Sequence, residues 1–354
     1  MLALQALTPA DLAGAVPQVS LAEARKLVAA VHRGEPVAAS SAVRRTSAGA
    51  VRAVGEVPAL EVIAETASAI DPFVKYLLAG SDGARFEAVR IPLEHPGRFT
   101  VCVSSQVGCA LACAFCATGR LGLARNLAAW EIVEQVRIVR SRLAGGRIHG
   151  VVFQGMGEPL ANLDAVVQAI RVFSEPSAQG IDARAITVCT AGLPAGIRRL
   201  AIEAPRVRLA LSVSSAIAAH RKAVMPIALR HDFEDVIAAV ADHARATGLA
   251  PMWAVTLLAG INDGEADARA LAARAIAFHA QTGVRPRISL LDYNAIGDGD
   301  PFGRSPRMPA FRDVLSAAGL ASHRRYSGGS DVAAACGQLA NTAADATPPR
   351  SDVR

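Results

Sequence analysis

The sequence predicts an α/β fold, a partial TIM-like barrel of six βα units. From about residue 100, short β-rich runs alternate with amphipathic stretches of helical periodicity. This alternation is typical of parallel strands joined by right-handed helical crossovers. No GxGxxG sequence follows any of the β-rich runs, whereas a doubly wound dinucleotide-binding sheet commonly carries one after its first strand. The barrel is therefore the better prediction.

Six strands and five helices are expected in this part of the chain. The strands are predicted at 99–105, 149–154, 185–190, 207–213, 252–258 and 286–293. The helices between them are predicted at 127–143, 162–176, 193–203, 233–247 and 264–282.

The barrel core is expected to span residues 101–325, with smaller segments on both sides. Residues 1–75 are rich in alanine and predict a small helical accessory region, and residues 76–100 predict a hairpin that leads into the first barrel strand. Residues 326–340 form a C-terminal loop that carries a cysteine, and residues 341–354, with proline and small polar residues, predict a flexible tail.

Composition excludes several classes of protein. Hydrophobic residues make up 52% and charged residues 19% of the 354 residues, which is too apolar a balance for intrinsic disorder. No run of about 18 uncharged apolar residues occurs, and the N-terminus lacks a basic segment before an apolar one, so we expect no membrane span, no secretory signal and a cytoplasmic location. The net charge of +6 permits a polyanionic partner without requiring one.

The strongest chemical signal is a group of cysteines directly after the first predicted strand. Cys109, Cys113 and Cys116 have the spacing C-x3-C-x2-C, and such crowding in a reducing compartment indicates metal or redox chemistry. Three thiolates can bind three irons of a [4Fe–4S] cluster and leave the fourth iron open to a ligand. The alternative is a structural zinc site completed by a distant cysteine or histidine.

The residues around these cysteines carry a resemblance to a known family. Phe115 stands between the last two cysteines, and the segments GMGEPLANLDAV (155–166), TVCTAGLPAGI (187–197) and AAACGQLA (333–340) follow in order. Together they resemble the RlmN/Cfr family of radical S-adenosylmethionine (SAM) RNA adenine methyltransferases. The resemblance extends from about Glu87 to Ala340.

The resemblance implies a radical SAM barrel that binds a [4Fe–4S] cluster and uses two SAM molecules per turnover. The implied reaction is methylation of adenine C2 in 23S rRNA, and of tRNA as a further substrate, through a 5′-deoxyadenosyl radical, with an electron donor such as flavodoxin. A radical route suits this carbon because adenine C2 is not nucleophilic, and the cofactor then supplies the difficult step.

Several residues at the carboxyl ends of the predicted strands match the SAM pocket of the family, where barrels build their active sites. Gly157 and Glu158 correspond to the segment that binds the SAM amino group, although a Gly-Glu turn alone is more often structural. Isolated Ser and Asn residues at strand ends usually cap helices, so only the resemblance assigns the remaining set. These residues are Cys189, Ser212, Val213, Ser214 and Asn294.

Three further residues are implied to be catalytic. Cys336 matches the cysteine that accepts a methyl group from the first SAM, and Cys102 matches the cysteine that resolves the resulting protein–RNA adduct through a transient Cys102–Cys336 disulfide. Glu87 aligns with a glutamate assigned as a proton acceptor. Without the resemblance, Cys336 would be interpreted as a buried structural cysteine and Glu87 as a solvent-exposed strand carboxylate.

Departures from the family pattern keep other functions open. Cys189 stands where serine is usual, Ser214 where histidine is usual, and Ala295 where proline is usual. One alternative is a diverged paralogue that acts on adenine C8, another RNA or a target other than RNA. A second is a non-catalytic zinc-containing RNA-binding module. Phosphate contacts are expected from Arg120, Arg125, Arg184, Arg324 and Arg325.

Overall fold

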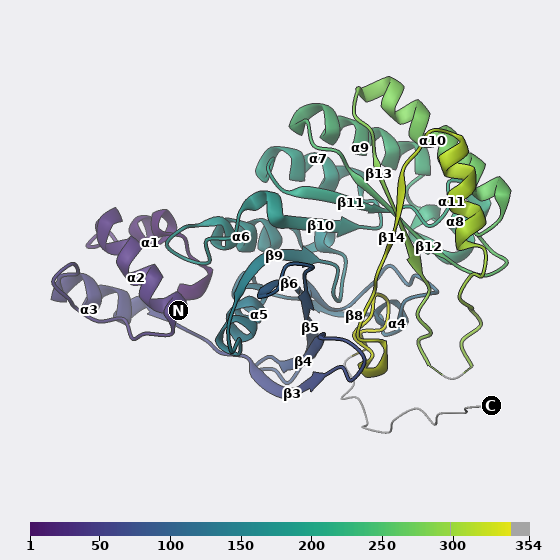
Figure 1. The fold of residues 1–354 in the computed structure, drawn as a ribbon. Helices are drawn as coiled ribbons and strands as arrows, with labels where there is room; N and C mark the ends of the chain where they lie inside the picture. Colours follow the sequence, from purple (N-terminus) through teal and green to yellow (C-terminus); the bar gives the residue numbers. More distant parts are fainter. Residues whose placement is uncertain (298, 341–354) are drawn as a thin grey trace.

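The structure, a computed structural model, describes residues 1–297 and 299–340 and is built around one ten-stranded sheet (Figure 1). The strand order is β14-β13-β12-β11-β10-β9-β6-β5-β4-β3. Neighbouring strands from β6 to β14 pair in parallel, and β3, β4 and β5 continue the sheet in antiparallel pairing beyond β6. The parallel strands are β6 (Arg98–Cys102), β9 (Arg147–Phe153), β10 (Ile186–Thr190), β11 (Arg208–Ser212), β12 (Met252–Leu257), β13 (Arg287–Asp292) and β14 (Ser322–Arg325).

Helices that follow the parallel strands pack side by side, each against the next in the sequence, and form the outer layer visible in Figure 1. The partial (βα)6 barrel predicted from the sequence is therefore confirmed, and the five predicted helices lie where they were expected. The layer consists of α5 (Ala129–Ser141), α6 (Leu163–Ser174), α7 (Pro194–Glu203), α9 (Phe233–Thr247), α10 (Glu265–Thr282) and α11 (Met308–Ala317).

The sequence explains both the strands and the ends of the helices. The apolar side chains of the barrel strands form one continuous core with the inner faces of the helices, as the burial of apolar surface requires. α9 and α10 both end at a glycine in the left-handed conformation, Gly248 and Gly283, because glycine adopts positive φ without a steric penalty.

The N-terminal prediction was correct only in part. Helices α1 (Pro9–Ala15), α2 (Leu21–Arg33) and α3 (Arg45–Val54) form a small apolar core of their own. Residues expected to continue this helical region form strands instead, since β3 is Glu61–Ala67 and β4 is Val74–Ala79, followed by β5 (Arg85–Pro92). Every second residue of β3 is exposed, Ile63 among them, so this edge strand lacks the clean apolar alternation by which strands are recognised.

The accessory helices contact the outer layer of the barrel. The guanidinium of Arg137 donates to the Val31 carbonyl at 2.9 Å, and the amide of Gln168 donates to the Ala6 carbonyl at 2.7 Å. Figure 1 shows these helices beside α5 and α6, with the C-terminal loop on a different part of the barrel. The accessory helices are thus separated from the cysteines.

The shorter elements complete the fold. β14 was not predicted as a strand because its sequence SHRR is polar, and the predicted tail at 341–354 lies outside the described residues. In the part of the chain that the structure describes, we find no helix with the length and apolar character that a membrane span requires. The remaining elements are β1 (Leu2–Ala3), β2 (Gly55–Glu56), β7 (Gln106–Gly108), β8 (Leu123–Asn126), α4 (Ala117–Arg120), α8 (Ala218–Val224), η1 (Leu4–Ala6), η2 (Pro159–Asn162), η3 (Ala183–Ala185), η4 (Pro226–Leu229) and η5 (Ser330–Val332).

Candidate active site

The cysteine loop is held at its base by the antiparallel strands β7 and β8. The amide of Cys109 donates to the Gly122 carbonyl at 2.8 Å, and the amide of Cys116 donates to the Cys113 carbonyl at 3.1 Å. A side chain at Gly119 would place its Cβ 2.9 Å from the backbone of Cys113, closer than such contacts normally allow. Only glycine therefore lets α4 pack this closely on the loop.

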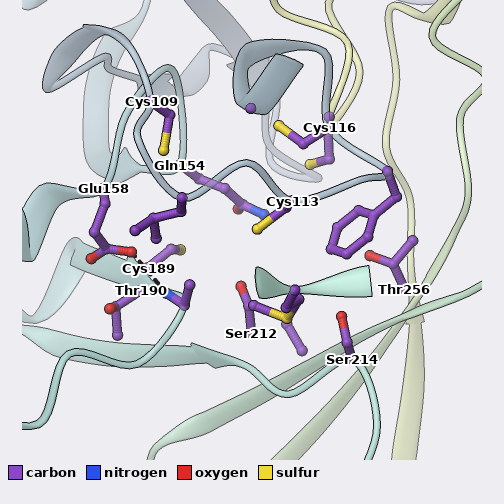
Figure 2. Close-up of a pocket in the computed structure, with 18 of the residues that line it drawn as sticks. Cys109, Cys113, Cys116, Gln154, Glu158, Cys189, Thr190, Ser212, Ser214 and Thr256 are labelled. Carbon is purple, nitrogen blue, oxygen red and sulfur yellow. Dashed lines mark hydrogen bonds between the residues drawn. The ribbon is translucent and has the colours of Figure 1, made fainter. Parts of the chain in front are cut away.

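The three loop cysteines line one cavity, at the carboxyl ends of the barrel strands. Figure 2 shows them along one wall, facing Glu158, Thr190 and Ser212. Burial raises the pKa of Cys109 to about 11 and that of Cys113 to about 12, and it also raises the pKa of Cys116. Without a bound metal the thiols are therefore protonated at neutral pH, and cluster binding must release their protons.

This donor set fits an iron–sulfur cluster better than a single ion. A structural zinc ion requires four ligands around one centre, and among residues 1–297 and 299–340 no three His, Cys, Asp or Glu side chains are grouped to hold one ion. Three separate thiols around one cavity match the three irons of a cluster that keeps one iron open.

Glu158 is a buried carboxylate that faces this cavity. Its two oxygens accept the amides of Leu160 at 3.1 Å and Ala191 at 2.8 Å. Gly157 has φ +97°, and a Cβ there would lie 2.5 Å from the side chain of Gln106, so the turn requires glycine. Burial raises the pKa of Glu158 to about 7, against the opposing effect of its hydrogen bonds. The carboxyl group is therefore positioned to bind an amine and titrates near neutral pH.

The other residues assigned to the SAM pocket divide into two groups. Cys189, Ser212 and Ser214 line the cavity, as expected for side chains at strand ends. Val213 is fully buried in the core and does not line it. Asn294 is not at the cavity wall either, but its amide donates to the Cys336 carbonyl at 3.3 Å.

Sequence reasoning missed several cavity residues. Thr190 and Thr256 also lie at the carboxyl ends of barrel strands, so the strand-end rule applied to every strand could have found them. The same rule applies to Gln154 and Tyr293, which end two of the predicted strands, and the cysteine motif itself places Leu111 and Phe115 at the site. Met225 and Leu291 become visible only in three dimensions, because no sequence pattern places them beside the cysteines.

A buried arginine that the sequence did not single out supports the floor of the cavity. Arg221 donates to the backbone carbonyls of Ser212, Val213 and Ala191, and its guanidinium lies 5.0 Å from the ring centre of Phe233. Burial lowers its pKa to about 10, so it stays charged at neutral pH. It fixes the ends of two strands through charge-assisted hydrogen bonds.

The C-terminal loop places Cys336 at the wall of the same cavity. The amide of Ala117 donates to the Gly337 carbonyl at 2.7 Å, and the hydroxyl of Thr118 donates to the Leu339 carbonyl at 2.6 Å. These bonds join the loop to α4, which follows the cluster cysteines. Two segments more than 200 residues apart thereby form one site.

The same loop is also held by the turn between β3 and β4. Asp331 accepts the Ser68 hydroxyl and the Ala69 amide, both at 2.7 Å. Asp71 accepts the Tyr326 hydroxyl at 2.7 Å and the Gly329 amide at 2.8 Å. The added antiparallel strands, which sequence analysis did not recognise in full, therefore help to position the loop of Cys336.

Cys102 and Glu87 lie on the neighbouring strands β6 and β5. Cys102 lines a second, smaller cavity, and Cys336 lines both cavities. Glu87 is completely buried, contrary to the alternative of a solvent-exposed carboxylate; it pairs with Lys75 at 3.0 Å and accepts the Ala340 amide at 2.8 Å. All six cysteines are free, so the expected transient disulfide is not present in this structure.

The arginines expected to contact phosphate are mostly engaged within the protein. Arg120 pairs with Asp300 at 3.3 Å, Arg125 with Asp82 at 2.6 Å, and Arg324 with Asp292 at 2.7 Å. Arg184 is exposed, whereas Arg325 is half-buried and lines the cavity of Cys102 and Cys336. Charge in the sequence did not reveal which arginines are available to an RNA.

The comparisons with known proteins agree with this geometry. Residues 103–272 match the Radical SAM superfamily. The chain is 59% identical to a probable RNA methyltransferase of Sorangium cellulosum, over 96% of this chain and 93% of the relative. It is also 43% identical to the dual-specificity RNA methyltransferase RlmN of Syntrophobacter fumaroxidans, over 80% and 81% of the two chains. The chain belongs to the RlmN/Cfr family of radical SAM RNA methyltransferases.

A solved structure supports the same membership for the whole fold. A radical SAM methyltransferase from Sphaerobacter thermophilus superposes with a TM-score of 0.85 at 34% identity, covering 97% of this chain and 100% of the other. For a radical SAM enzyme, the three-cysteine cavity is the site where a [4Fe–4S] cluster and SAM are implied. Cys109, Cys113 and Cys116 are the residues that fit the cluster.

Proposed function

We propose that this chain methylates C2 of an adenine in 23S rRNA, with tRNA as a second substrate, and that Cys336 carries the methyl group. The observation that supports this most strongly is the position of Cys336, which lines the cavity of the cluster cysteines on one side and the cavity of Cys102 on the other. A thiol at that boundary can receive a methyl group in one cavity and be freed from its product in the other.

The cofactor side of the reaction relies on the first cavity. Bound there, a reduced cluster and SAM would supply a 5′-deoxyadenosyl radical, the reagent that an unreactive carbon requires; two SAM molecules would be used per turnover, and flavodoxin is a suitable electron donor. Cys109, Cys113 and Cys116 would hold the cluster. Glu158 would bind the SAM amino group through its buried carboxylate.

The other residues of the proposed site have supporting roles. Gly157 allows the turn that aims Glu158, while Cys189, Ser212 and Ser214 shape the pocket wall. Asn294 supports the Cys336 carbonyl, and Val213 contributes from the core beneath. Cys102 would displace the product from Cys336, and Glu87, buried on the neighbouring strand, would accept a proton.

Nucleoside mass spectrometry of rRNA and tRNA from cells with and without the gene tests this function. We expect 2-methyladenosine to disappear from 23S rRNA on deletion and to return with the wild-type gene. It should not return with Cys336→Ala or Cys102→Ala, if both proteins accumulate to the wild-type level. Unchanged 2-methyladenosine in both RNAs after deletion would contradict the proposal.

A diverged target is the second candidate, and the replaced pocket residues favour it. Cys189 and Ser214 line the cavity at positions where the family usually has serine and histidine. The same nucleoside analysis separates the candidates, because loss of 8-methyladenosine, or of a modification in another RNA, would replace C2 of 23S rRNA as the target. Iron and sulfide in the purified protein would exclude the zinc module.

A further inference from the structure

The second cavity contains a positive charge that the proposed function does not use. Its wall combines Cys102 at the end of β6, Arg325 at the end of β14, and Cys336 and Gly337 from the C-terminal loop. Gln154 and Cys336 belong to this wall and to that of the cluster cavity. Cys336 is therefore the partition between the two spaces, with Arg325 on the side of Cys102.

Arg325 differs from the arginine next to it. The guanidinium of Arg324 pairs with Asp292 at 2.7 Å. In the part of the chain that the structure describes, Arg325 has no ion pair, and its Nη1 is buried without a hydrogen-bond partner. A buried cationic donor without a hydrogen-bond partner lowers the free energy of unfolding. We therefore expect an anion to lie beside Arg325 for part of the time.

The groups that face Arg325 are thiols. Burial tends to lower its pKa, but Cys336, Cys189 and Cys102 act in the opposite direction and raise the pKa of Arg325 above its usual value. The same proximity acts in reverse on Cys102: burial, Cys336 and Cys189 raise the pKa of that thiol well above its usual value, and Arg325 opposes the rise. The resting thiol is therefore protonated at neutral pH. The arginine therefore favours the anionic form of the sulfur beside it.

Other charged groups near Cys102 are already neutralised or lie outside the cavity wall. Lys75 and Glu87, on the strands beyond β6, form an ion pair with each other. The Tyr326 hydroxyl donates to Asp71. His323, two residues before Arg325, has a pKa lowered by burial and by Arg287 and Arg325. Of these groups, Arg325 is the one whose charge is directed at the cysteines.

We propose that Arg325 is a positioning residue that stabilises the negative charge on the Cys102 sulfur as this thiol loses its proton and attacks Cys336. This inference rests on the proposed function, in which Cys102 attacks the Cys336 sulfur after a group R has been attached to it. The Cys102–Cys336 bond forms and the bond from Cys336 to R breaks. R leaves with the electron pair and takes a proton from water, and a small thiol reductant supplies the two electrons that reset the pair.

The attack can be measured without RNA or SAM. The cluster-loaded full chain, in a Cys189→Ser background that leaves two reactive thiols, is treated with oxidised glutathione, which forms a mixed disulfide on the more exposed Cys336. Release of glutathione as Cys102 attacks is then followed from about pH 6 to 9 by mass spectrometry of acid-quenched samples. A Cys102→Ala variant retains the glutathione and provides the control.

Replacing Arg325 by Met should slow glutathione release about tenfold at each pH, while the rate still rises with pH across the whole range because the thiolate fraction rises. Arg325→Lys keeps the charge and should restore most of the rate. Arg325→Gln, which keeps polarity without charge, should behave like Arg325→Met and serves if the Met variant does not fold. A purely structural role would lower thermal stability, and Arg325→Lys and Arg325→Gln would then release glutathione at the same rate.

Two results would overturn the inference. One is an unchanged rate of glutathione release in a folded Arg325→Met or Arg325→Gln protein. The other is a wild-type chain that keeps glutathione on Cys336, because Cys102 would then not reach it. Failure of the RNA methylation assay together with the expected exchange profile would instead reject the proposed substrate and leave the role of Arg325 standing.

Discussion

The two cavities that meet at Cys336 are assembled in different ways. The cluster cavity takes its three cysteines from one short loop and most of its other wall from the ends of consecutive barrel strands. The Cys102 cavity combines β5, β6, the edge strand β14 and the C-terminal loop. Local spacing therefore encodes the first cavity, whereas the second exists only because distant strands and loops are brought together.

The largest expected effect is on the cluster cavity. Replacing Cys113 by Ala removes one of three adjacent thiolates and should abolish stable cluster binding and all methylation. Iron and sulfide content and the visible absorption of anaerobically purified protein measure this. Cys189→Ser, a change at the wall of the same cavity, should retain its iron, and a Cys113→Ala protein with wild-type iron content would show that another residue supplies the ligand.

The next effect tests the framework of the Cys102 cavity. Lys75→Met removes the lysine of a fully buried ion pair and should lower the free energy of unfolding by roughly 3 kcal/mol, because the charge of Glu87 would stay buried. Urea unfolding measures the difference. Lys26→Met, at an exposed position on α2, is the matched control and should change stability by less than about 0.5 kcal/mol. Equal stability of the two variants would refute a structural role for the pair.

A smaller effect, the pH dependence of SAM binding, should distinguish the cluster cavity from the Cys102 cavity. Burial raises the pKa of Glu158 to about 7, so its carboxyl group is neutral below that pH and anionic above it. The affinity for the SAM ammonium should therefore rise with pH and level off above neutrality. Glu158→Gln should remove this step and weaken binding roughly tenfold at alkaline pH. Isothermal titration calorimetry checks both, and parallel pH profiles for the two proteins would exclude Glu158 as the titrating group.

The smallest effect concerns how the C-terminal loop is held. Asp331 is exposed and accepts two hydrogen bonds from the β3–β4 turn, so Asp331→Ala should lower stability by about 1 kcal/mol. Hydrogen exchange should accelerate in residues 327–339 and remain unchanged in the cysteine loop. Asp313→Ala, at an exposed position on α11, is the control, and uniform acceleration in both loops would mean that the two cavities are not separately supported.

The sequence was informative about the cluster cavity and much less so about the Cys102 cavity. Cys109, Cys113 and Cys116 are close in the sequence and line one cavity, and the barrel strands behind them carry strong apolar patterns and were predicted correctly. β3 and β14 are edge strands with exposed positions, and they are held in the sheet by backbone pairing that many sequences can form. Their side chains therefore did not predict that these strands would support the loop of Cys336.

Individual site residues show which side-chain positions could be predicted and which could not. The family resemblance assigned Cys189, Ser212 and Ser214 to the SAM pocket, and they line the cavity because strand ends converge at one edge of a parallel sheet. Val213, next to two of them, points into the core because side chains alternate along a strand. The sequence did not predict the backbone contacts of Arg221 or the position of Arg325 beside the cysteines. The partners of a long side chain depend on which distant backbone or thiol lies within its reach.

The sequence by itself determined the order of the βα units, the cluster motif and the family, since each depends on residue types at short fixed separations. Tertiary structure decided the environment of Glu87, which is buried with Lys75, and the placing of Cys336 between two cavities. It also decided which arginine faces the cysteines. These properties depend on burial and on contacts between segments hundreds of residues apart, and no local pattern of residues specifies either.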